Sequence, residues 1–153
     1  MIEKIISGGQ TGADQGGLFA GLILGITTGG TAPPNFMTDT GPKKEFLISF
    51  GLIEGVPDPS TYPKRTWENV KNSDGTALFG NLYSPGTRLT MRYCKTLLKP
   101  YIKNPLPSEL REFINQYSII VLNIAGNRER TNPGITKRVT DTIVEALRVL
   151  RSE

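Results

Sequence analysis

The sequence contains no histidine and a single cysteine, Cys94, among its 153 residues. Without histidine, the chain cannot form a histidine-based catalytic triad, a histidine metal site or an imidazole acid–base step. One cysteine cannot close an internal disulfide, which fits a reducing compartment. Any catalysis would therefore depend on Asp, Glu, Lys, Tyr or the lone thiol, and we expect no metal site.

Long apolar runs and clusters of basic residues are also missing. No stretch approaches the length of a membrane span, and the N-terminus lacks the apolar core of a signal peptide, so we expect a cytoplasmic protein without a membrane partner. The net charge of +4 favours an anionic partner, but it is spread along the chain. Because no basic stripe with interleaved aromatic residues is present, a phosphorylated small molecule is a better expected partner than nucleic acid.

What the chain does contain is the composition of a globular protein, with 37% hydrophobic and 21% charged residues. Its length predicts one domain covering residues 1–153. Hydrophobic periodicity predicts an alternation of strands and helices. We expect strands at residues 1–7, 26–31, 76–79, 100–103 and 118–125, helices at 14–24, 63–72, 85–98, 107–116 and from 135 onward, and a long surface loop at 32–49.

This alternation predicts an α/β sandwich around a mainly parallel sheet. The stretch 118–125, "SIIVLNIA", is apolar enough for a central parallel strand. The last helix carries one apolar stripe at helical spacing, formed by Ile135, Val139, Ile143, Leu147 and Leu150. In such folds ligands bind beyond the carboxyl ends of the strands, which directs attention to the loops there.

The first of these loops, "SGGQTGAD" at residues 7–14, concentrates glycine between a strand and a helix. Gly8, Gly9 and Gly12 would let backbone N–H groups face an anion at the positive end of the helix dipole. The loop matches neither the dinucleotide fingerprint nor a P-loop. The alternative is a tight turn in which Thr11 or Asp14 caps the helix; Asp14 could instead bond a ribose or pterin group.

Two further loops have a comparable character. In "SPGT", the hydroxyls of Ser84 and Thr87 can bond phosphate, although a Ser-Pro helix start explains the same residues without a ligand. In "AGNRER", Arg128 and Arg130 follow a buried strand, where arginine suits phosphate or carboxylate. Pairing with Glu129 or Asp141 is the alternative for both arginines.

Four other residues have simpler interpretations. Asp74, in "SDGT", is typical of a turn. Tyr62 and Trp67 could stack on a flat ring, but packing in the core or an interface is favoured for Trp67. Cys94 lies within a predicted helix and is expected to be a small buried apolar residue.

Taken together, the stretches "SGGQTGADQGGL", "GGTAP", "YPKRTWENVKNSDGTALF", "SPGTRLT" and "LNIAGNRERTNPGI" resemble the molybdenum cofactor carrier protein family. That family is a circularly permuted branch of a superfamily that includes lysine-decarboxylase-like phosphoribohydrolases and bacterial DNA-processing proteins. The resemblance implies a Rossmann-like three-layer fold and a non-catalytic homotetramer. Such a protein holds the molybdenum cofactor, a phosphorylated pterin, and passes it to molybdoenzymes.

The resemblance also implies which residues line the site. Together with Asp14 they are Gly8, Gly9, Gln10, Thr11, Gly12, Ser84, Gly86, Thr87, Gly126 and Arg128. Arg65 and Asp74 match motif positions without an assigned role. The chain departs from the family where Asn127 replaces a proline, where Arg130 replaces a serine, and at "NFMTDTGPKKE", residues 35–45, where a more polar, acidic stretch is usual. These departures bear on the choice of ligand.

Two other functions remain open. One is a sensor of another nucleotide-like ligand. The other is a nucleotide phosphoribohydrolase, an enzyme type whose members have a glutamate in a "PGG-x-GT-x-x-E" loop. The nearest stretch here, "SPGTRLT", is shorter and has Thr90 at the position of that glutamate. Threonine cannot supply a carboxylate's proton transfer, so catalysis is the less favoured function.

Overall fold

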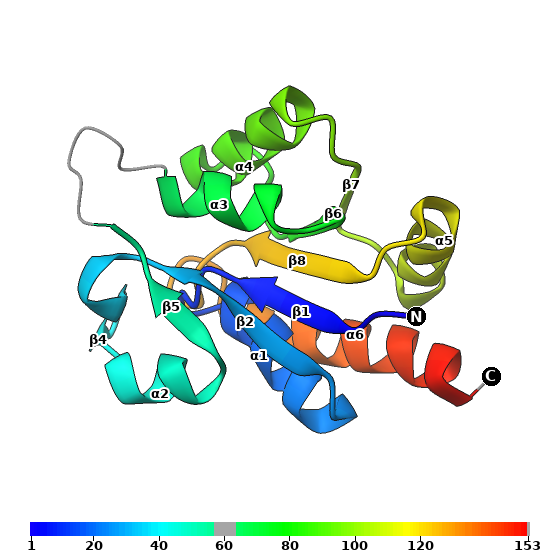
Figure 1. Ribbon diagram of the computed structural model, residues 1–153, viewed down its shortest axis with the longest axis horizontal. Coiled ribbons are helices and arrows are strands. Elements are labelled where there is room, and N and C mark those ends of the chain that lie inside the picture. Colours follow the sequence, from blue (N-terminus) through cyan, green and yellow to red (C-terminus); the bar gives the residue numbers. More distant parts are fainter. Residues whose placement is uncertain (57–63, 153) are drawn as a thin grey trace.

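Six parallel strands form the central sheet of the computed structural model, which describes residues 1–56 and 64–152, without the side chains of 149–152. The strand order is β5-β2-β1-β8-β6-β7 (Figure 1). All five pairings between neighbours are parallel. The strands are β1 (Lys4–Ser7), β2 (Thr27–Ala32), β5 (Leu52–Glu54), β6 (Gly75–Phe79), β7 (Tyr101–Lys103) and β8 (Val121–Gly126). This sheet confirms the predicted α/β class.

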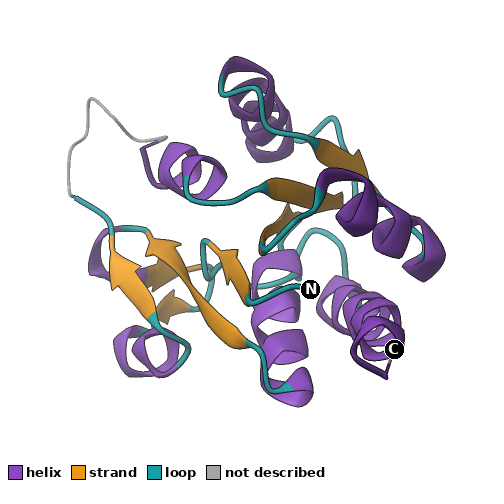
Figure 2. Ribbon diagram, turned by 45° about the vertical axis from the view of Figure 1, so that its right-hand side comes forward, coloured by secondary structure: helices purple, strands orange, loops and turns teal. Residues whose placement is uncertain are grey.

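Helices cover both faces of the sheet (Figure 2). The helices α3 and α4 lie on one face and α1 and α6 on the other, where α5 packs against α6 (Figure 1). They are α1 (Ala13–Leu24), α2 (Lys44–Ser49), α3 (Lys64–Lys71), α4 (Pro85–Thr96), α5 (Pro107–Tyr117) and α6 (Ile135–Ser152). The three layers confirm the Rossmann-like sandwich. No helix within the described residues is both long and apolar enough to cross a membrane.

The main core lies between the sheet and the helices α1, α5 and α6. Leu122 and Ile124 of β8 are fully buried, as expected for a central parallel strand. The predicted stripe on α6 faces this core, with Ile135, Val139, Ile143 and Leu147 at most 1% exposed, while Leu150 lies outside the described side chains. The start expected for α3 at Pro63 also lies outside the described residues.

Two glycines of α1 permit the close packing of this layer. A Cβ on Gly16 would lie 2.9 Å from the Cβ of Val139 in α6, and one on Gly17 would lie 2.8 Å from the Cβ of Ile124. Real Cβ atoms do not approach so closely, so α1 needs these two glycines to pack against α6 and β8. The helix ends where predicted, with Gly25 in the left-handed conformation. Leu18 is buried, whereas Leu22, one turn later and near the end of the helix, is 68% exposed.

The prediction of a long surface loop at residues 32–49 is wrong. The segment contains a short 3-10 helix, η1 (Pro34–Phe36), an antiparallel hairpin of β3 (Met37–Thr38) and β4 (Gly41–Pro42), and α2. Phe36 and Leu47 are buried in a second, smaller core with Leu18 and Leu52. Sequence periodicity missed these elements and β5 because each is six residues or fewer, too short to show a helical or strand period.

Candidate functional site

The glycine-rich loops meet at one edge of the sheet. The neighbouring strands β8 and β6 end there, and their following helices, α6 and α4, lie on opposite faces (Figure 1). The loops therefore diverge and leave a crevice, which is where open α/β sheets bind ligands. The loop after β1 reaches the same edge. The predicted convergence of the three loops is present in the structure.

A cavity of about 470 Å³ occupies this crevice; we call it the Ser84 cavity. Eight of the predicted site residues line it: Gly8, Gln10, Asp14, Ser84, Gly86, Thr87, Gly126 and Arg128. Gly9, Thr11 and Gly12 are not among the described lining residues, so their contact with a ligand stays a prediction. Sequence reasoning did not select other members of the lining, notably Asn69, Asn123 and Asn127, and it had left Arg65 without a role.

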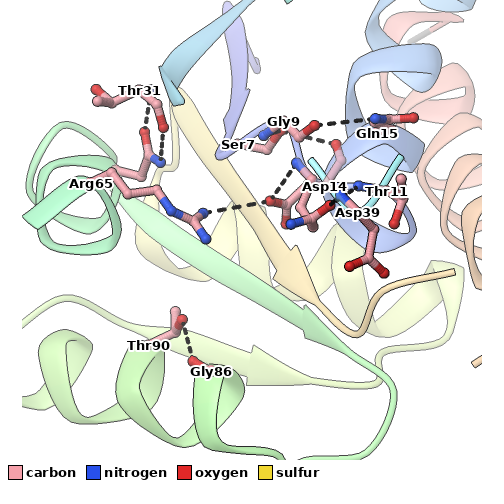
Figure 3. A network of polar contacts seen from close by, with 12 residues as sticks. Ser7, Gly9, Thr11, Asp14, Gln15, Thr31, Asp39, Arg65, Gly86 and Thr90 are labelled. Atoms are coloured by element: carbon pink, nitrogen blue, oxygen red, sulfur yellow. Dashed lines mark hydrogen bonds and ion pairs between the residues drawn. The ribbon is translucent and has the colours of Figure 1, made fainter. Parts of the chain in front are cut away.

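The backbone N–H groups of the first loop donate to the protein itself. Gly9 N–H donates to Ser7 Oγ (3.3 Å), Gln10 N–H to Asp14 Oδ2 (3.2 Å) and Thr11 N–H to Gln10 Oε1 (3.0 Å). Figure 3 shows this closed network around Asp14. We expected the N–H groups of Gly8, Gly9 and Gly12 to face an anion, but Gly9 N–H donates within the turn, where the buried carboxylate of Asp14 lies.

Gly9 and Gly12 are needed for packing. Gly9 has φ +77°, and a Cβ there would lie 2.8 Å from Leu52 and 2.9 Å from Leu47. Gly12 has φ +88°, and its Cβ would collide with the carbonyl oxygen of Asn127. This loop carbonyl also accepts from the first N–H of α1, Ala13 N–H, at 3.0 Å. No side chain of the described residues caps α1, so the alternative of Thr11 or Asp14 as its cap is not observed.

Asp14 and Arg65 form an ion pair at the base of the Ser84 cavity. Arg65 Nη1 lies 4.0 Å from Asp14 Oδ2, and the Asp14 side chain is only 9% exposed (Figure 3). Burial raises the pKa of Asp14 to about 6, against the opposing effects of Arg65 and of the N–H groups of Gln10 and Gly8. Desolvation dominates here because the carboxylate loses water and gains only a long ion pair.

The N-terminus of α4 opens onto the same cavity. Ser84 is the N-cap and Pro85 the first helical residue, as predicted. Ser84 Oγ donates to Thr87 Oγ1 (2.9 Å), and among the described residues no side chain caps the helix. The N–H groups of Gly86 and Thr87 have no intrahelical acceptor, because the first turn of a helix never provides one. This terminus can therefore donate to an anion.

Asn127, which stands where the resembling family has proline, joins two of the loops. Its Nδ2 donates to Asn81 O (3.1 Å) and Ser84 Oγ (3.2 Å), and its Oδ1 accepts from Asn81 N–H (2.5 Å). The side chain is buried. Asn127 thus holds the loop after β8 against the loop after β6 and shapes the cavity between them. A single polar residue in a loop carries no sequence pattern that predicts this contact.

Arg128 pairs with an aspartate distant in sequence. Arg128 Nη1 donates to Asp39 Oδ1 at 2.8 Å, and Arg130 Nη2 reaches the same oxygen at 3.4 Å. The alternative partners proposed from sequence are occupied elsewhere. Asp141 accepts from Lys137 (2.6 Å), and Glu129 accepts from N–H groups at the start of α6. These hydrogen bonds lower the pKa of Glu129, and the bond from Gly134 N–H has the largest effect.

A second cavity, of about 710 Å³, lies beside the first; we call it the Asp39 cavity. Its apolar walls are Pro33, Pro34, Met37, Ile53 and Val56, and its charged lining residues are Asp39, Glu54, Lys64, Arg65, Glu68 and Arg128. Gln10, Arg65 and Arg128 line both cavities. The two spaces are therefore adjacent, with the two arginines at their junction.

The remaining candidate residues lie in structural contacts. Asp74 Oδ2 accepts from Ile120 N–H (3.0 Å) and Val121 N–H (2.8 Å) at the start of β8, at the edge of the sheet opposite the cavities. Trp67 packs edge-on against Tyr93 at 5.1 Å, between α3 and α4. Cys94 is buried, as predicted, and burial raises the pKa of its thiol. Tyr62 lies outside the described residues. No cluster of three or more Cys, Asp or Glu side chains in the described ranges could hold a metal ion.

A parallel sheet with a polar cavity at the divergence of two crossover helices defines a Rossmann-like protein whose cavity lies where such folds bind nucleotide-like ligands. The chain belongs to the circularly permutated YpsA SLOG family, whose model matches residues 5–147. A solved structure of a "putative molybdenum carrier protein" from Syntrophus aciditrophicus SB is 34% identical over 95% of both chains, with a TM-score of 0.84. No curated protein matches the chain.

Proposed function

We propose that this protein binds the molybdenum cofactor, a phosphorylated pterin, protects it, and hands it to molybdoenzymes. The observation that carries the proposal is the position of Arg65 and Arg128, which line both cavities. A ligand with an anionic end and a flat ring would place its charge near these arginines and extend on either side. The name given to the similar protein from Syntrophus aciditrophicus supports the same class of cargo.

The Ser84 cavity fits the phosphate end of such a ligand. It combines the first-turn N–H groups of α4 with the hydroxyls of Ser84 and Thr87 and with two guanidinium groups. Arg128 donates one N–H to Asp39 and, with five N–H donors in all, has others for a phosphate. At about 470 Å³ the cavity falls in the usual range of small-molecule sites, about 300–1,000 Å³.

The cofactor is cargo in this proposal, and its metal-bound dithiolene supplies chemistry only to the recipient enzyme. The task of this chain is to hold the pterin and limit the access of dioxygen and water to it. The proposal extends to a cytoplasmic homotetramer as the carrying form, on the family resemblance alone.

The test is an anaerobic titration of the purified protein with the molybdenum cofactor, followed by air oxidation of free and bound cofactor. We expect saturable binding and slower oxidation of the bound pterin. Absence of cofactor binding would refute the proposal. AMP is titrated in parallel, with an assay for released ribose 5-phosphate.

The AMP experiment distinguishes the two alternatives. Cleavage would indicate a phosphoribohydrolase, for which Asp14, with its pKa of about 6, is a proton acceptor within the Ser84 cavity. Thr90 cannot fill that role, and its hydroxyl donates to Gly86 O (3.0 Å). AMP binding without cleavage and without cofactor binding would indicate a nucleotide-like ligand sensor.

A further inference from the structure

We propose that the Asp39 cavity is a subsite for a planar heterocycle and that Asp39 selects a ring that presents an amino group beside a ring N–H. This inference deepens the proposed function, on which it rests, because a pterin has that edge. Its basis is one buried carboxylate oxygen for which the described residues provide no partner.

The two carboxylate oxygens of Asp39 differ in their contacts with the described residues. Its side chain is 8% exposed, and Oδ1 accepts from Arg128 and Arg130. The other oxygen, Oδ2, is buried and has no hydrogen-bond partner among the described residues. Leaving a buried acceptor unpaired costs about 1–3 kcal/mol, and more for a charged group. Because Asp39 lines the cavity, its unpaired acceptor indicates a donor that a ligand would bring.

The carboxylate is held in place before any ligand arrives. Asp39 N–H donates to Gln10 Oε1 (2.7 Å), and the same oxygen also accepts from Thr11 N–H in the loop after β1. Next to Asp39 in the hairpin, Thr38 Oγ1 donates to Gly41 O (2.7 Å). Preorganisation of this kind reduces the entropy that a ligand must lose on binding.

The walls of the cavity suit the faces of a ring. Met37, Ile53 and Val56 line it and are exposed, and Pro33 and Pro34 add further apolar surface. An exposed apolar patch beside a polar, unpaired group is typical of a small-molecule site. A flat heterocycle would cover this patch and bring its polar edge to Asp39.

The charges of the cavity assign the two ends of the ligand. Among the described lining residues of the Asp39 cavity, three carboxylates balance three cations, whereas the Ser84 cavity has two arginines against Asp14 alone. A phosphate is therefore better accommodated in the Ser84 cavity, and the carboxylates of the Asp39 cavity can accept from N–H donors. The phosphate therefore belongs in the Ser84 cavity and the ring in the Asp39 cavity, with Arg128 contacting both spaces.

The test compares 6-hydroxymethylpterin with 6-hydroxymethyl-lumazine, in which a 2-oxo group replaces the 2-amino group. Neither probe carries phosphate, so the Ser84 cavity contributes little to the difference between them. Binding is measured by calorimetry for the unmodified protein, for Asp39→Asn and for a control, Asp141→Asn, at an exposed position of α6. We expect the unmodified protein and the control to prefer the pterin by about 10-fold or more.

Asp39→Asn should erase or reverse this preference. The amide oxygen would keep accepting from the two arginines, which leaves the amide N–H₂ in place of Oδ2. That group repels the amino edge of the pterin and donates to the 2-oxo group of the lumazine. Circular dichroism checks that the variant is folded.

Three results would overturn the inference: no binding of either ring, no preference in the unmodified protein, or an unchanged preference in Asp39→Asn. The second result needs no variant and holds even if Asp39→Asn does not fold. Cofactor binding without the ring preference would leave the carrier standing and remove this subsite. The ring preference without cofactor binding would refute the carrier and keep the subsite.

Discussion

Replacing Asp14 with asparagine should remove a pH-dependent part of the folding stability. The carboxyl group is buried beneath the Ser84 cavity, and burial raises its pKa from the ordinary value of 3.8 to about 6. The folded protein therefore holds this proton more tightly than the unfolded chain does. The resulting stabilisation is fully present below pH 3.8 and is lost as the pH rises through about 6.

The size of the effect follows from that interval. At about 1.36 kcal/mol per pH unit, the separation between 3.8 and about 6 corresponds to roughly 3 kcal/mol of unfolding free energy. The side chain is 9% exposed, so solvent screening reduces this figure little. Asparagine does not titrate, and the variant lacks this contribution at every pH.

The assay is urea unfolding of the unmodified protein and Asp14→Asn at intervals between pH 4 and pH 8. The difference in unfolding free energy between the two should fall by roughly 2.4 kcal/mol from pH 4 to pH 8, because part of the titration of the unfolded chain lies below pH 4. Other titrating groups, including Glu129 with its lowered pKa, are common to both proteins and cancel. Asp141→Asn, at an exposed pair with Lys137, is the control and should leave the pH profile unchanged. Parallel profiles for the unmodified protein and Asp14→Asn would refute the burial argument.

Three further predictions concern single residues. Gly9→Ala should lower the unfolding free energy by about 2 kcal/mol or more, because it puts a side chain on a left-handed backbone and a Cβ within 2.9 Å of two leucines. The control Gly86→Ala, whose Cβ meets no atom within 4 Å, should be neutral or slightly stabilising. Equal melting temperatures of the two variants would contradict this prediction. Asp74→Ala should cost about 1.5–3 kcal/mol of stability in chemical unfolding and leave ligand affinity unchanged, since its two N–H contacts lie at the opposite edge of the sheet. Arg128→Ala should weaken cofactor binding in calorimetry by about 1.5–3 kcal/mol. Arg92→Ala, exposed on α4 and outside both cavities, should bind normally, and unchanged affinity in Arg128→Ala would exclude Arg128 from the site.

Much of the architecture could be predicted because it depends on local pattern. The apolar run in β8 and the stripe on α6 are each long enough to show their periods, and both are buried as expected. The parallel sheet followed from their alternation, and the meeting of the glycine loops followed from the parallel sheet. The prediction of a loop at residues 32–49 failed because the short elements there are stabilised by the packing of Phe36 and Leu47 in a core with Leu18, which local sequence pattern does not show.

The site divides in the same way. Ser84, Thr87 and Arg128 could be selected from the sequence because loops after parallel strands must meet at one edge, and Gly86 was added by the family resemblance. The residue types alone could not show that the first glycine turn is closed by its own Asp14, which accepts from the N–H groups of Gln10 and Gly8. Glycine-rich turns that bind anions and glycine-rich turns that pack tightly have the same composition.

The amino-acid sequence by itself determined the fold class, the family and the edge of the sheet where the candidate site lies, because strand and helix periods and strand–loop–helix motifs are local. Only the tertiary structure decided that Asp39 meets Arg128, 89 residues away, with one carboxylate oxygen left without a partner in the described part of the chain. Asp39 lies in the stretch at 35–45 that departs from the family pattern. Its environment, like the raised pKa of Asp14, depends on burial and on distant partners that exist only once the chain has folded.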